Sequence, residues 1–64
     1  MDAAEAREAV TRARGALDRA MRALSVPDPD GEAAIRSLRA CADLCDRLIV
    51  RIVSERLGGG SWRS

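Results

Sequence analysis

Apolar residues recur with helical spacing along two long stretches of the chain. In the first stretch they are Ala3, Ala6, Val10, Ala13, Leu17, Ala20 and Leu24, and in the second Ile35, Leu38, Ala42, Cys45, Ile49 and Ile52. Intervals that alternate between three and four residues keep side chains on one side of an α-helix. The pattern therefore predicts two helices, each with an apolar seam facing the other. Smaller residues flank these seams: Ala9, Ala16 and Ala23 on the first helix, and Ala34, Cys41 and Leu48 on the second.

Capping and turn residues set the ends of the two helices. Asp2 is a favourable N-cap with Glu5 three residues later, which predicts a first helix over about 2–25. Pro27 disfavours helical geometry at the preceding residue and predicts a turn over about 25–29. Asp28 is then expected to cap a second helix, about 29–57, with Pro29 at its first position.

So short a connection favours antiparallel neighbours. The expected fold class is all-α: residues 1–57 form an antiparallel helical hairpin of two long helices. Residues 58–64 contain three consecutive glycines and Trp62, and we interpret them as a flexible tail.

The second half of the second helix is apolar on too many sides for a single neighbour. From Leu44 onward its apolar side chains cover more than half of the helix circumference, whereas one neighbour needs a stripe a little over ~100° wide. Another chain is expected to cover the remainder, either a second copy that completes a four-helix bundle or a different helical protein. The residues predicted to form contacts are Val10, Ala13, Leu17, Ala20, Leu24, Leu44, Leu48, Ile49, Val50, Ile52 and Val53.

Composition supports a chain that needs a partner. With 64 residues and one aromatic side chain, a single hydrophobic core is marginal. Eleven arginines balance ten acidic residues, and this near-neutral, interspersed set argues against a strong field for nucleic acid. The longest aliphatic run, Leu48 to Val50, is far shorter than the ~20 residues of a membrane span. No secretion signal is recognisable, so we expect a cytoplasmic protein with reduced thiols.

Cys41 and Cys45 lie one helical turn apart and allow three interpretations. They can be small core residues, because free cysteine packs like a small apolar side chain. They can bind Cu(I) or zinc, with two chains supplying four thiolates, because the chain has no histidine. The Cys-x3-Cys spacing resembles that of copper-binding four-helix bundles, although those carry many more cysteines. The third interpretation is a disulfide between subunits.

The function expected from these patterns is an interaction module. The sequence offers no positioned base for thiol chemistry and no phosphate-binding loop, which argues against an enzyme, and it requires no cofactor. The first hypothesis is therefore a small self-associating hairpin that acts as an oligomerisation module or regulator. The alternatives are a metal site at Cys41 and Cys45 and nucleic-acid binding by Arg7, Arg12, Arg14, Arg19 and Arg22.

Overall fold

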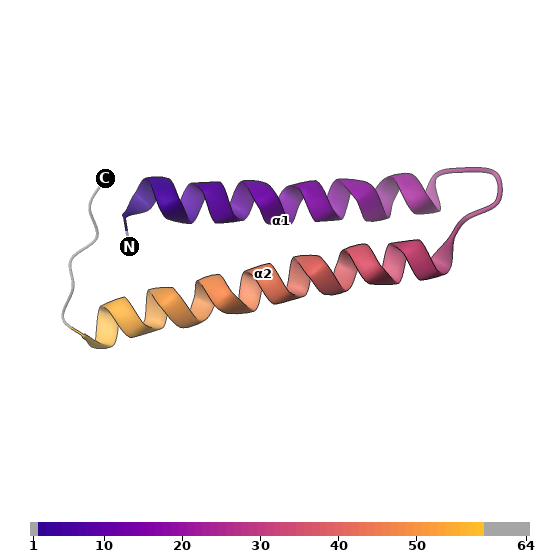
Figure 1. The fold of residues 1–64 in the computed structure, drawn as a ribbon. Helices are drawn as coiled ribbons and strands as arrows, with labels where there is room; N and C mark the ends of the chain where they lie inside the picture. The colour runs from indigo at the N-terminus through magenta and orange to yellow at the C-terminus, as the bar shows by residue number, and fades with distance from the viewer. Residues whose placement is uncertain (1, 59–64) are drawn as a thin grey trace.

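The computed structural model describes residues 2–58 and contains two helices packed against each other as a hairpin (Figure 1). Helix α1 spans Ala3–Leu24 and helix α2 spans Gly31–Leu57. The prediction of an all-α antiparallel hairpin is confirmed. The expected tail lies outside the described residues except for Gly58, which follows the last residue of α2.

Helix α1 begins as the sequence predicts. The Asp2 side chain accepts a hydrogen bond from the Glu5 backbone N–H at 2.8 Å, so one of the unpaired donors of the first turn is satisfied. The Glu5 carboxylate faces the other helix and lies 3.5 Å from the Arg51 guanidinium. The cap therefore leaves Glu5 available for a contact that joins the start of α1 to the far part of α2.

Helix α2 begins two residues later than predicted, and its cap is Asp30 rather than Asp28. The Asp30 side chain accepts from the Ala33 backbone N–H at 3.0 Å. The Asp30 backbone N–H donates to the Ala23 carbonyl, also at 3.0 Å, and so ties the connection to the end of α1. Both aspartates are chemically able to cap a helix, and this backbone bond to Ala23 selects the second. Gly31, not Pro29, takes the first helical position.

Alanines of α1 make the contact between the helices, two from the predicted seam (Ala13, Ala20) and one from its flank (Ala16). Ala13, Ala16 and Ala20 are buried, Ala16 completely. Ala34 and Cys41 are the buried residues of α2, and Leu44, Leu48 and Ile52 continue that side half-buried. The predicted seam is wrong at Val10, Leu17, Leu24, Ile35, Leu38 and Ile49, which are exposed, whereas its members Ala13 and Ala20 are buried. We call the buried and half-buried side of α1, from Ala6 to Ala23, the alanine seam.

Small side chains explain why the helices pack this way. Alanine lets two helix backbones approach closely, and larger residues on the same side would hold them apart. The inward residues of α2 grow from Ala34 and Cys41 near the connection to Leu44, Leu48 and Ile52 further along. In the view of Figure 1 the two ribbons accordingly run closer together near the connection than at the ends of the chain. The result is a flat hairpin whose Cα atoms extend over 50 × 18 × 8 Å.

Enlarging the alanine seam is expected to destabilise the hairpin. Ala16→Leu places a large side chain where the exposed fraction is zero, and such overpacking costs about 1–3 kcal/mol of the free energy of unfolding. Urea denaturation followed by circular dichroism measures this change. Ala40→Leu, at an exposed position of α2, is the matched control and should lose much less. Equal losses at the two positions would contradict close packing at Ala16.

The position of the α2 cap can be tested with two variants of equal charge. Asp30→Ala removes the bond to the Ala33 N–H and should lower the free energy of unfolding by about 1 kcal/mol. Asp28→Ala should leave that free energy nearly unchanged. The same denaturation measurement distinguishes them, and a larger loss at Asp28 would contradict the observed cap.

Candidate interaction surface

One side of the hairpin carries most of its large apolar side chains in exposed positions. The set comprises Val10, Leu17, Met21 and Leu24 from α1 and Ile35, Leu38, Ile49 and Val53 from α2. We call these eight residues the apolar face. Their exposed fractions run from 44% at Leu38 to 67% at Met21. A row of exposed large apolar side chains on both helices is typical of a surface that another molecule covers.

The geometry of a hairpin puts the two halves of the apolar face on the same side. At ~100° per residue, the apolar residues of each helix lie roughly a quarter turn from its inward side, in the same rotational sense. Because the helices run antiparallel, equal rotation turns both halves toward one side of the flat hairpin. The eight side chains therefore form one surface across α1 and α2.

The opposite side of the hairpin is charged. A shallow hollow between the helices is lined there by Glu5, Glu8, Ala9, Arg12, Leu44, Arg47, Leu48 and Arg51. Three ion pairs lie on or beside it: Arg47–Asp43 at 3.0 Å, Arg51–Glu5 at 3.5 Å and Arg12–Glu8 at 3.8 Å. Their side chains are more than half exposed, so each contributes little to stability. The hairpin is thus amphipathic across its thickness.

Five charged residues lie on the outer edges of the apolar face. They are Arg7, Arg14 and Asp18 on α1 and Arg39 and Asp46 on α2, and we call them the rim. None of the five forms an ion pair with another residue between positions 2 and 58. Asp18 and Arg22, although four residues apart on α1, accordingly form no ion pair. The rim thus presents unpaired charges of both signs beside the apolar side chains.

The residues predicted to form contacts fall into three groups. Val10, Leu17, Leu24, Ile49 and Val53 belong to the apolar face, whereas Ala13, Ala20, Leu44, Leu48 and Ile52 face the other helix of the same hairpin. Val50 is exposed but lies further round α2, beyond the rim. Met21, Ile35 and Leu38 complete the face and were absent from the predicted set. The position of Met21, four residues after Leu17 and three before Leu24, is the signal that could have revealed it.

The two cysteines occupy different environments. Cys41 is buried against Ala13 and Ala16, as the core interpretation of this residue predicts, whereas Cys45 is exposed. Burial raises the pKa of the Cys41 thiol above its ordinary value, and the neighbouring Cys45 thiol raises this pKa further. Within residues 2–58, no three Cys, Asp or Glu side chains come together as metal ligands. Metal binding between two chains stays a prediction that would require Cys41 to leave the interior.

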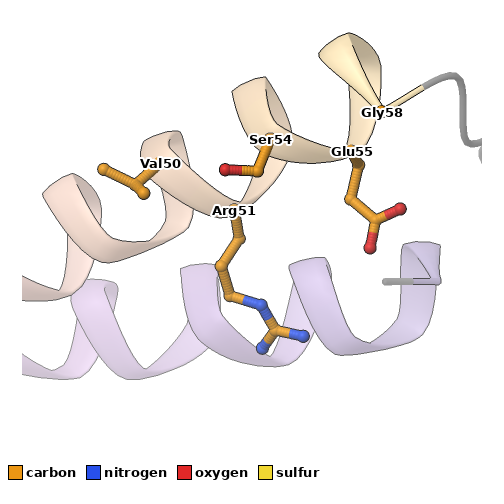
Figure 2. Close-up of a pocket in the computed structure, with 5 residues that line it drawn as sticks. All are labelled: Val50, Arg51, Ser54, Glu55 and Gly58. Atoms are coloured by element: carbon orange, nitrogen blue, oxygen red, sulfur yellow. The ribbon is translucent and has the colours of Figure 1, made fainter.

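A second hollow lies near the C-terminal end of α2. Its lining residues are Val50, Arg51, Ser54, Glu55 and Gly58, and Figure 2 shows the Arg51 and Glu55 side chains directed toward α1. The hollow is open to solvent at the surface. The polar side chains that line it are those of Arg51, Ser54 and Glu55, and no cysteine or histidine is among the lining residues. The hollow therefore offers no basis for assigning catalysis.

The arginines considered for nucleic-acid binding are divided between two sides of α1. Arg7 and Arg14 belong to the rim, whereas Arg12, Arg19 and Arg22 lie toward the charged side, where Glu8 partly neutralises Arg12. A nucleic-acid backbone requires positive charge gathered along one track. The structure does not gather these five residues, and the nucleic-acid hypothesis stays a prediction.

Comparisons with protein-family models, with curated proteins and with solved structures found no match to this chain. Over the part of the chain that the structure describes, neither α1 nor α2 has a stretch long and apolar enough to cross a membrane. The geometry of the apolar face, its rim and the charged side is thus the basis for inferring function.

The two thiols are expected to react at different rates. In the folded protein Cys45 should be alkylated at least about tenfold faster than Cys41, because Cys41 is buried and its raised pKa leaves less thiolate at a given pH. Iodoacetamide labelling of Cys41→Ala and Cys45→Ala proteins, followed by mass spectrometry, measures each rate. Rates should become similar in urea, and equal rates in the native protein would contradict the burial of Cys41.

Proposed function

We propose that this chain is a self-associating helical hairpin that acts as a protein–protein interaction module, with the apolar face as its contact surface. The observation that carries the proposal is the position of the eight large apolar side chains on one side of the molecule. Completely burying a fully exposed side chain of this size contributes about 1.5–3 kcal/mol, and these side chains are about half exposed. Even partial cover of the face would thus supply a substantial driving force for association.

The interior of the hairpin makes such cover energetically important. The buried residues in the described part of the chain are four alanines and Cys41, and no large side chain is fully buried. A hairpin whose interior holds mainly methyl groups gains little from its own burial. A second chain against the apolar face would add the large side chains to a common core, as in a four-helix bundle.

The dimensions of the hairpin fit an ordinary protein interface. Its broad side measures 50 by 18 Å between Cα atoms, or about 900 Å², whereas a stable interface takes roughly 800 Å² from each partner. The apolar face runs along most of that side, from Leu24 and Ile35 near the connection to Val10 and Val53 toward the ends of the chain. One copy of the hairpin can therefore supply an interface of standard size.

The character of the surface favours a protein partner. The rim contains both signs of charge, and the chain as a whole has a formal net charge of +1. An anionic polymer would instead require a positive surface. A second copy fits this surface, because it offers an identical apolar face and an identical rim of three arginines and two aspartates.

Replacing one residue of the apolar face should disrupt association. Ile49→Glu puts a charge into the proposed contact and should weaken dimer formation by at least about tenfold, because a carboxylate must then lose water. Val50→Glu is the matched control, since Val50 is equally apolar and exposed but lies off the face. Sedimentation equilibrium in the presence of reductant measures the dissociation constant of each variant.

The unaltered chain should be a dimer at micromolar concentration in that measurement. A folded monomer, shown by full helical circular dichroism with the mass of one chain, would overturn the proposed function. Equal weakening by Ile49→Glu and Val50→Glu would also count against the apolar face as the contact surface.

A further inference from the structure

We propose that two copies associate about a two-fold axis parallel to the helices, with both connections at the same end, and that the rim charges select this arrangement. The inference rests on the proposed self-association and adds the geometry of the pair. It also assigns a role to Asp18, Arg39 and Asp46, which form no ion pair within the part of the hairpin that the structure describes.

The hairpin itself fixes which residues of α1 and α2 lie at one level. Glu5 contacts Arg51, so we take these two residues to lie at the same level along the hairpin axis. Because the helices are antiparallel, one residue forward along α1 is then level with one residue back along α2. On this scale Asp18 is level with Leu38, one residue from Arg39, or about 1.5 Å along the axis. Asp46 is level with Val10, between Arg7 and Arg14.

A two-fold axis parallel to the helices preserves these levels. It places α1 of one copy beside α2 of the second copy, so the rim of α1 meets the rim of α2. Asp18 then faces Arg39 of the second copy, and Asp46 of the second copy lies between Arg7 and Arg14. All five rim charges receive an opposite charge, and symmetry repeats each pairing. No sliding of one copy along the other is needed to obtain this match.

A two-fold axis perpendicular to the helices gives a poorer match. It places α1 beside α1 of the second copy, running in the opposite direction. With the midpoint of α1 aligned, Arg39 meets Asp46 of the second copy, but the two Arg14 side chains come close together. Asp18 then lies two residues, or about 3 Å along the axis, from the level of Arg7 of the second copy, so the approach of the two Arg14 side chains is what disfavours this arrangement. Like charges at an interface discriminate against such an arrangement.

A reversal of charges tests the Asp18–Arg39 pairing. Asp18→Arg and Arg39→Asp should each weaken dimerisation by about 3- to 30-fold at low ionic strength, because each puts like charges opposite one another. The double variant should restore the dissociation constant to within about threefold of that of the unaltered chain, since the pair is re-formed with its signs exchanged. Sedimentation equilibrium at low and at high salt measures these constants, and high salt should reduce the differences.

The matched control combines Asp18→Arg with Arg36→Asp. This protein has the same net charge as the restoring double variant, but Arg36 lies on the outer side of α2, away from the apolar face. It should remain as weak as Asp18→Arg alone. Circular dichroism confirms that each variant is folded, because all of these positions are exposed.

The positions of the connections provide an independent test. Spin labels on Asp28→Cys, in a Cys41→Ala/Cys45→Ala background, should lie roughly 20 Å apart in the dimer, because both connections are at one end. The opposite arrangement would separate them by at least the ~33 Å length of α1.

A dimer with the longer distance, or a double variant that is not restored, would overturn this arrangement and leave self-association intact. A folded monomer would overturn both the arrangement and the proposed function.

Discussion

Close contact along the alanine seam is the constraint on which the rest of this structure depends. Ala13, Ala16 and Ala20 on α1 let the backbone of α2 approach, with Ala34 and Cys41 opposite them. Near the connection, two helices that meet through methyl groups leave little room between them for larger side chains. Leu44, Leu48 and Ile52 face α1 further along, whereas most other large apolar side chains lie about a quarter turn away on one common side.

In most small proteins one hydrophobic core both fixes how the helices pack and buries the large apolar side chains, whereas in this hairpin different residues do each. The seam determines how the two helices meet, whereas the apolar face holds most of the apolar surface still available for burial. A short chain with few large interior residues is marginal on its own. The same feature that permits close packing inside the hairpin thus makes the proposed partner energetically useful, and in the proposed dimer the rim charges choose how that partner sits.

The cysteines show how strongly tertiary position decides chemistry. Cys41 and Cys45 are one helical turn apart, yet one is buried against the alanine seam and the other is exposed. The thiol with the raised pKa is the one that reagents reach least easily. The sequence spacing placed Cys45 on the predicted seam and Cys41 beside it, whereas the packing of α2 against α1 buries Cys41 and leaves Cys45 exposed.

The sequence by itself determined the two helices, their antiparallel connection and the caps at Asp2 and at an aspartate of the turn. These features depend on local spacing, on proline geometry and on side chains that bond nearby backbone groups. Only the tertiary structure decided which apolar stripe faces inward, because both stripes of each helix have helical spacing and size alone distinguishes them. The predicted seams mixed large and small residues, but the small ones allow the closer backbone approach. That choice of stripe turned Val10, Leu17 and Ile49 outward, and with them it created the surface that the proposed partner would cover.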